Sequence, residues 1–193
     1  MTERNDSYFT VAEEAINEIK IERSRFIGHC KEVDSEEEAK EFINLISTEH
    51  RQANHNCFAY KLGWGKTELT YYSDDGEPNG TGGRPILGAI NSLELTNVVV
   101  VVTRYFGGKK LGVRGLIEAY GQAARLALEK ARKVKRVVTR ELEVVCNYSE
   151  LDRILYIVNK YGGKVLNSDY SSDVRLNIAL PLSVWEEVSQ LIK

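Results

Sequence analysis

The chain has 193 residues, of which 42% are hydrophobic and 28% are charged; this is the composition of an ordinary globular protein that can bury a core without disulfides. No segment approaches the ~18 consecutive apolar residues of a membrane helix, and the polar N-terminus lacks the apolar region of a secretory signal. Three irregularly spaced cysteines argue against a disulfide framework, so we expect a cytoplasmic protein without a membrane partner.

The net charge of −2 conceals an uneven distribution of charge along the chain. Residues 1–103 carry 10 Lys and Arg against 18 Asp and Glu, residues 104–136 carry 10 against 2, and residues 137–193 carry 6 against 8. The middle segment is therefore strongly basic, whereas the segment before it is strongly acidic. A basic segment inside an acidic chain is a candidate anion-binding surface.

Local patterns in the first half of the chain predict strands and a helix. Residues 16–33 alternate apolar and polar side chains, as strands do. Ser35 followed by Glu38 is the sequence pattern of a capping box and predicts the start of a helix. The aromatic-rich segments 56–64 and 69–73 predict two further strands.

Two glycine-rich segments separate the next elements. The first, SDDGEPNGTGGRP at residues 73–85, leads into a predicted helix with Pro85 in its first turn, where the missing N–H is tolerated. The five valines at 98–102 predict a central strand that is buried on both faces. The second glycine-rich segment, GGKKLGVRG at residues 107–115, precedes a helix that is predicted from Leu116 onward.

The pattern changes near the end of the basic segment, and we expect two domains, residues 1–135 and residues 136–193. The second domain reads strand, helix, strand, strand, helix, with Ser149 and Ser183 as predicted helix N-caps. This order is that of a ferredoxin-like unit cut short before its final strand. The expected fold class is therefore α+β with two domains.

The turn after the valine strand is a candidate anion site. Its glycines let backbone N–H groups approach a ligand, and the N-terminus of the next helix favours negative charge. The candidate phosphate- or RNA-binding residues are Arg84, Arg104, Gly107, Gly108, Lys109, Lys110 and Arg114. The spacing matches neither the P-loop nor the dinucleotide fingerprint, so a tight turn with solvated lysines is an equal alternative. The basic run at residues 130–138 is either a solvated helix end or an extension of the same basic groove.

The first glycine-rich segment also contains three carboxylates that are candidate metal ligands. Asp74, Asp75 and Glu77 could bind Mg²⁺, which needs few protein ligands. The same residues could form hydrogen-bonded turns instead, and turns are the favoured interpretation. A third interpretation pairs Asp74 or Asp75 with Arg84 or Arg104, which would order the segment as the edge of a binding site.

Histidines and cysteines close together in sequence invite two further interpretations. His55 and Cys57 share one face of a predicted strand, and His29 precedes Cys30. A zinc site is disfavoured because no standard ligand spacing is present. A Cys–His nucleophile needs the imidazole beside the thiol in space, and a buried thiol with a hydrogen-bonded histidine is the favoured alternative.

Aromatic side chains near the candidate anion site could stack on unpaired bases of a nucleic acid. Because aromatic residues in strands more often belong to the core, the core interpretation is favoured. The candidates for stacking are Tyr60, Tyr71, Tyr72, Tyr105 and Phe106.

Four segments together resemble the IMPACT/YigZ family: SRFIGH, HNCFAYKLG, SDDGEPNGTGGRPIL and VVVVTRYFGGKKLGVRGLIEAYGQAA. The resemblance spans about residues 16–130, and residues 138–193 resemble the small second domain of the family. It implies a first domain of the ribosomal-protein-S5-domain-2-like type and a ferredoxin-like second domain, a pair similar to the last two domains of elongation factor G.

The resemblance also implies a connection with translation. Eukaryotic relatives restrain a kinase that phosphorylates an initiation factor, by competing for the activator of that kinase. The family has no established catalytic residues, so the resemblance supplies only candidate functional positions in the matching segments. These positions are Asp74, Asp75, Glu77, Arg84, Arg104, Gly107, Gly108 and Lys110.

These observations favour a binding protein over an enzyme. We expect the basic surface to bind RNA or the ribosome and to regulate translation or a stress response. One alternative is an enzyme acting on a phosphorylated or nucleotide substrate, with Mg²⁺ on the three carboxylates and the phosphate on Arg104 and Lys110; no other cofactor is expected. Another alternative is a protein-interaction module that regulates a translation factor.

Overall fold

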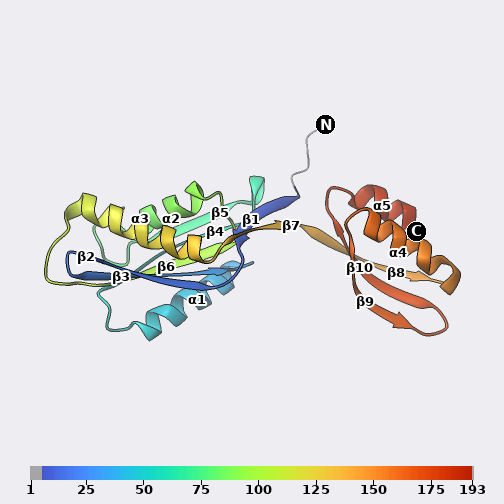
Figure 1. Ribbon diagram of the computed structural model, residues 1–193, viewed down its shortest axis with the longest axis horizontal. Helices are drawn as coiled ribbons and strands as arrows, with labels where there is room; N and C mark the ends of the chain where they lie inside the picture. Colours follow the sequence, from blue (N-terminus) through green and yellow to red (C-terminus); the bar gives the residue numbers. More distant parts are fainter. Residues whose placement is uncertain (1–5, 193) are drawn as a thin grey trace. The chain divides into compact units, whose positions relative to one another are not determined.

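The computed structural model describes residues 6–192, which fold into two compact units (Figure 1). The first unit runs from Phe9 to Lys135, and the second contains, among the described residues, 6–8 and 136–192. The strands β1 (Ser7–Val11) and β7 (Lys133–Val137) pair in a two-stranded sheet. Both points at which the chain divides between the units lie in these strands, after Tyr8 in β1 and after Lys135 in β7. None of the helices within residues 6–192 combines the length and hydropathy of a membrane span.

A five-stranded antiparallel sheet forms the centre of the first unit, in the order β2-β3-β6-β4-β5. One helix covers one face of this sheet and two helices cover the other (Figure 1). The strands are β2 (Ala15–Ile21), β3 (Ser24–Glu32), β4 (His55–Leu62), β5 (Leu69–Ser73) and β6 (Val98–Tyr105). The helices are α1 (Glu36–Glu49) on the first face, and α2 (Gly83–Ser92) and α3 (Gly112–Lys130) on the second. A short 3₁₀ helix, η1 (Gly65–Thr67), connects β4 and β5.

The valine run forms the central strand β6, and the prediction that it is buried on both faces is confirmed. Val98, Val100 and Val102 belong to the core beneath α2 and α3. Val99 and Val101 belong to the separate core beneath α1. Because successive side chains of a strand point to opposite faces, five valines in a row supply both cores at once.

The N-cap predicted for the first helix, Ser35, is confirmed, but the reciprocal bond of the predicted capping box goes to the N–H of Asp34, one residue before the N-cap. The Ser35 hydroxyl accepts a hydrogen bond from the Glu38 backbone N–H at 3.1 Å, and the Glu38 carboxylate accepts one from the Asp34 N–H at 2.9 Å. The third helix begins at Gly112, earlier than the predicted Leu116. Gly112 has a φ of +73°, which lets the chain turn sharply into the helix, so the predicted glycine turn is shorter than expected.

Two predictions made for the chain after α3 are wrong. The basic run is not a helix end, because α3 stops at Lys130 and Lys133–Val137 forms β7, paired with β1. The helix α4 (Tyr148–Lys160) is capped by Asn147 rather than Ser149. The Asn147 side chain accepts from the Glu150 N–H, and Glu150 accepts in return from the Asn147 N–H. Asparagine is as good an N-cap as serine, so the sequence contained two adequate candidates.

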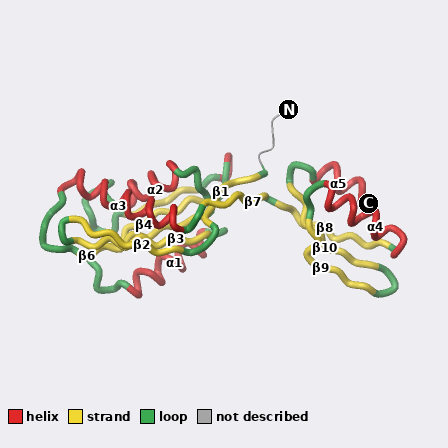
Figure 2. The backbone as a smooth tube through the Cα atoms, in the orientation of Figure 1, coloured by secondary structure: helices red, strands yellow, loops and turns green. Residues whose placement is uncertain are grey.

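The second unit is a three-stranded antiparallel sheet of order β8-β10-β9, with two helices on one face (Figure 2). Its elements are β8 (Thr139–Cys146), α4, β9 (Lys164–Tyr170), β10 (Val174–Pro181) and α5 (Trp185–Ile192). The strand β10 lies between β8 and β9, as the split βαβ arrangement requires. The expected two-domain α+β architecture is confirmed; the similarity to elongation factor G stays a prediction.

Candidate functional site

The first glycine-rich segment is ordered by the carboxylate of Asp74. Its two oxygens accept hydrogen bonds from the backbone N–H groups of Gly80 at 2.8 Å and of Gly82 and Gly83 at 2.9 Å. Burial acts to raise the pKa of Asp74, but these three donors outweigh it and the pKa is lowered. Because Gly82 and Gly83 open α2, Asp74 also caps that helix from a distance in sequence.

We expect Asp74→Ala to lower the free energy of unfolding by about 2 kcal/mol, because three backbone donors lose a charged acceptor. The lowered pKa means that the contribution of Asp74 is present above its unfolded pKa and is lost as the pH falls through the folded value. Urea denaturation at neutral and acidic pH measures both effects. Asp152→Ala, on the exposed side of α4, is the matched control and should change stability by less than ~0.5 kcal/mol. Equal losses in the two variants would contradict the capping role.

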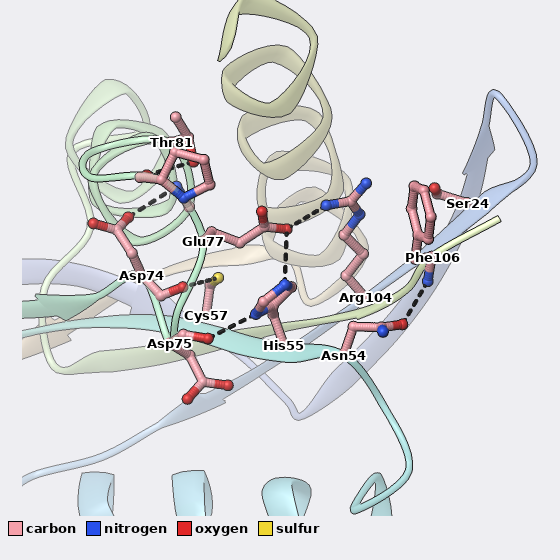
Figure 3. Close-up of polar contacts among 12 residues, drawn as sticks. Ser24, Asn54, His55, Cys57, Asp74, Asp75, Glu77, Thr81, Arg104 and Phe106 are labelled. Carbon is pink, nitrogen blue, oxygen red and sulfur yellow. Dashed lines mark hydrogen bonds and ion pairs between the residues drawn. The ribbon is translucent and has the colours of Figure 1, made fainter. Parts of the chain in front are cut away.

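The start of α2 packs directly against the end of β5. A Cβ atom on Gly83 would lie 2.6 to 2.8 Å from the backbone of Ser73, so only glycine allows this approach. The Thr81 hydroxyl donates to the Pro78 carbonyl at 2.6 Å and closes a turn within the segment. The segment is therefore a fixed part of the structure, and it directs Glu77 into the first unit (Figure 3).

Glu77 and Arg104 form a buried ion pair at the end of the central strand (Figure 3). Their side chains are 4% and 7% exposed, and Arg104 Nη1 lies 2.5 Å from Glu77 Oε1. The phenol of Tyr120 donates to the same carboxylate oxygen at 2.8 Å. Burial raises the pKa of Tyr120, so the phenol remains protonated and serves as a donor. The earlier interpretation that paired Arg104 with Asp74 or Asp75 is therefore wrong, since Glu77 is the partner.

One donor of Arg104 remains unpaired. The Nε of Arg104 is buried, and the described part of the chain offers it no hydrogen-bond partner. The guanidinium carbon lies 5.5 Å from the ring centre of Phe26 and 5.3 Å from that of Phe106, so the group lies between two aromatic rings. The charge of the guanidinium is balanced by Glu77, but its Nε–H is a buried hydrogen-bond donor without an acceptor.

His55 lies beside the ion pair and has a defined tautomer when neutral. Its Nδ1 is 2.7 Å from the carbonyl oxygen of Asp75, and a carbonyl only accepts, so Nδ1 carries the hydrogen. Its Nε2 then faces Glu77 Oε1 at 3.8 Å. The imidazole is one-quarter exposed and is held toward the carboxylate from the solvent side.

Cys57 is not positioned or ionised as a nucleophile. Its thiol donates to the Asp74 carbonyl at 2.9 Å, and burial raises the pKa of the thiol to about 12. The thiol is therefore protonated at neutral pH, as the buried-thiol interpretation expected. Within residues 6–192 no group of three histidine, cysteine or acidic side chains is arranged to hold a metal ion.

The three carboxylates considered as candidate Mg²⁺ ligands are used in three different ways. Asp74 binds backbone N–H groups, Asp75 accepts from the Asn56 N–H at 2.6 Å, and Glu77 pairs with Arg104. Asp75 adopts a φ of +43° within a hydrogen-bonded turn, the type of role that the turn interpretation assigned. The structure thus does not bring these three oxygen donors together around one point.

A pocket of about 450 Å³ opens above the ion pair. Apolar side chains make up much of its wall, and a few polar groups project into it. The polar residues are Asn54, His55, Glu77, Arg104 and Lys110, and the apolar ones are Pro78, Phe106, Leu111, Val113 and Leu116, with Gly112 beside them. Of the residues predicted to bind phosphate or RNA, only Arg104 and Lys110 line this pocket.

The second glycine turn has a structural role that differs from the predicted one. The Gly107 N–H donates to the Ser24 hydroxyl at 3.1 Å, so it is not directed at a ligand. A Cβ atom on Gly107 would lie 2.1 Å from the backbone of Arg23, which makes glycine necessary for packing against the turn between β2 and β3. Asn54 fixes the adjacent residue, because its side-chain oxygen accepts from the Phe106 N–H at 2.8 Å.

The basic segment is largely neutralised by glutamates, and four of these belong to the acidic first part of the chain. At least six of its ten cations are in ion pairs, so the charge predicted for one basic groove is not available as a whole. The pairs are Arg104–Glu77, Lys109–Glu22, Arg114–Glu118, Arg125–Glu129, Arg132–Glu13 and Lys133–Glu94. Arg84, on the first turn of α2, does not line the pocket.

Of the aromatic residues considered for stacking, only Phe106 lines the pocket, where it is 44% exposed. Tyr105 binds His50 through its hydroxyl, and Tyr60 and Tyr71 stack on each other elsewhere.

Sequence reasoning missed Asn54 and Tyr120 as parts of the site. Tyr120 has a core-type position in α3, and the only signal for a polar role is that a buried phenol needs a partner.

Two family domains match the chain: residues 22–128 match the Impact N-terminal domain, and residues 144–193 match a domain of unknown function, DUF1949. The chain is 45% identical to IMPACT family member YvyE of Bacillus subtilis, over 77% of this chain and 68% of the relative. It is 36% identical to IMPACT family member YigZ of Escherichia coli, over 88% of this chain and 84% of the relative.

Two solved structures are also similar. A crystal structure of a hypothetical protein has a TM-score of 0.71 and 34% identity, and the match covers 96% of this chain and 91% of the other. The structure of Yih1, described as a two-domain translational regulator, has a TM-score of 0.39 and 30% identity, over 64% of this chain and 46% of the other.

Proposed function

The chain belongs to the IMPACT family, and from this premise and the geometry of its pocket we propose that it is an RNA-binding protein rather than an enzyme. The pocket would hold one unpaired nucleotide, with the base against Phe106 and a phosphate oxygen near Arg104 and Lys110. Regulation of translation, through RNA of the ribosome, is the biological role that we propose for this binding.

The unpaired Nε of Arg104 is the observation that carries the proposal. A buried N–H without an acceptor costs free energy, and a turn of the guanidinium toward the pocket on ligand binding would let an anionic oxygen satisfy it. Arg104 already neutralises Glu77, so the ligand would gain a hydrogen bond from Arg104 and a full charge from Lys110. A phosphate fits this combination of one directed donor and one cation.

The apolar part of the pocket supports a ligand that also has a flat, weakly polar body. Phe106 exposes nearly half of its surface and is held in place by the guanidinium beside it. Proteins that recognise single-stranded RNA use such rings to stack on bases that have left a helix. A duplex would not present a base to this pocket, so we propose a single-stranded ligand.

The ion pairing of the basic segment limits the number of phosphates that can be bound. For single strands the logarithm of affinity falls with the logarithm of salt concentration with a slope of about −0.7 per neutralised phosphate. With most cations of this segment already paired, we expect a slope close to that of one or two phosphates. A steep salt dependence would instead indicate a long electrostatic track.

We predict that Phe106→Ala and Lys110→Glu each weaken binding of a fluorescein-labelled oligouridylate about tenfold, because one removes the stacking ring and the other reverses the cation. Fluorescence anisotropy at low salt measures the dissociation constants. Matched controls are Tyr156→Ala and Lys164→Glu, which change an exposed aromatic ring and an exposed cation in the second unit. Both controls should bind like the parent protein. Absence of saturable binding at low salt, or equal losses in the controls, would reject the proposal.

A further inference from the structure

The edge strand β5 is uncharged and carries exposed aromatic residues. The sheet of the first unit ends at β5 on one side and at β2 on the other. The sequence of β2 includes Glu18 and Lys20, charges of the kind that protect a sheet edge from pairing. The sequence of β5 is Leu-Thr-Tyr-Tyr-Ser, in which Tyr71 is 54% exposed and Tyr72 43% exposed. This edge is therefore an unprotected template for strand addition.

A pocket of about 490 Å³ lies between this edge and α1. Its floor is a set of stacked aromatic rings, because the ring centre of Tyr71 lies 6.1 Å from that of Phe58 and 5.7 Å from that of Tyr60. Ile43 on α1 provides an aliphatic wall. A side chain projecting from a strand added to β5 would enter this pocket.

The helix beside the pocket is acidic. Glu36 lines the pocket, pairs with Lys40 and accepts a hydrogen bond from the Tyr60 hydroxyl at 2.9 Å. Glu37 and Glu41 are exposed on the same helix, so these four side chains carry a net charge of −2. A second copy of this chain would bring identical acidic helices together, whereas a basic segment would be attracted.

We propose that β5 binds an extended, basic peptide segment of a partner protein as an added strand. Main-chain hydrogen bonds to β5 would supply affinity, and alternate apolar side chains would enter the aromatic pocket. Lysine or arginine side chains of the segment would lie near Glu37 and Glu41. The rings of Phe58, Tyr60 and Tyr71 belong to the sheet face that α1 covers, whereas Arg104 lies on the opposite face, so this site is separate from the nucleotide pocket.

The probe is a synthetic, blocked peptide of sequence Lys-Phe-Lys-Val-Lys-Val-Lys, titrated into the ¹⁵N-labelled full chain. We expect saturable shifts of backbone amide resonances in β5 and in α1. Tyr71→Ala and the double variant Glu37→Lys/Glu41→Lys should each weaken binding about tenfold, because the first removes one ring of the pocket floor and the second reverses the charge of the helix beside the pocket. Because the substituted side chains are exposed, we expect both variants to fold like the parent. The dispersion of the amide resonances in their ¹⁵N spectra verifies the fold.

Matched controls test whether binding depends on the charge of the peptide and on the position of the substituted residues. Glu143→Lys/Asp152→Lys makes the same change in net charge within the second unit and should bind like the parent. The same peptide with glutamate in place of lysine should not bind, and Phe106→Ala should bind the basic peptide normally. The proposal fails if the two peptides bind equally, if the shifts map outside β5 and α1, or if no saturation occurs. If sedimentation shows a dimer of the parent that Tyr71→Ala dissociates, the edge of β5 binds a second copy of the chain. This result would also overturn the proposal.

Discussion

Arg104→Met alone is expected to lower the free energy of unfolding of the first unit by about 3–5 kcal/mol, because Glu77 would stay buried without its counter-charge. The double variant Arg104→Met/Glu77→Gln should recover most of this loss. It removes both charges, and the amide oxygen of glutamine can still accept from Tyr120. The expected signature is therefore a strong positive coupling between the two substitutions.

Urea denaturation monitored by tryptophan fluorescence measures this coupling. The chain contains two tryptophans, Trp64 in the first unit and Trp185 in the second, so a Trp185→Phe background makes fluorescence report the first unit alone. If the double variant is no more stable than Arg104→Met, the two charges do not stabilise each other and the electrostatic description of the site is wrong.

His29 should make the first unit sensitive to acid. Its side chain is buried, and neither ring nitrogen has a hydrogen-bond partner in the described part of the chain. Burial, with a smaller contribution from the nearby His50, lowers the pKa of His29 to about 4. Below pH 6.5 the unfolded chain binds a proton that the folded chain does not, so stability is complete above pH 6.5 and falls as the pH drops toward 4. The loss over this range is about 3 kcal/mol.

The corresponding test compares the parent with His29→Leu by urea denaturation between pH 7 and pH 4. Leucine does not titrate, so the variant should lose this part of the pH dependence while any difference at pH 7 reports only packing. If the free energy of unfolding of the parent does not change between pH 7 and pH 4, protonation of His29 does not destabilise the folded state and the prediction is wrong. Equal slopes in the parent and the variant would assign the pH dependence to other groups.

The pairing of charges explains why the most conspicuous feature of the composition was misleading. Residues 104–136 are strongly basic in sequence, and this predicted a single anion-binding groove. In the structure Glu13, Glu22, Glu77 and Glu94 come from the acidic first part of the chain to pair with cations of this segment. Net charge along a sequence is a sum, whereas a binding surface depends on which charges remain unpaired in space.

Local sequence was sufficient for most of the helices and strands and for the two-domain organisation. Helix caps, amphipathic helices and the valine run depend on residues that are close together in sequence. The sequence therefore predicts them without knowledge of the tertiary structure. The edge pairing of β1 with β7 was not predicted, because the partners are more than a hundred residues apart.

The candidate site was likewise decided by the tertiary structure. Glu77, Arg104 and Tyr120 meet only after a loop, a strand and a helix have packed together, and ion pairs and pockets depend on distances in space that local patterns do not encode.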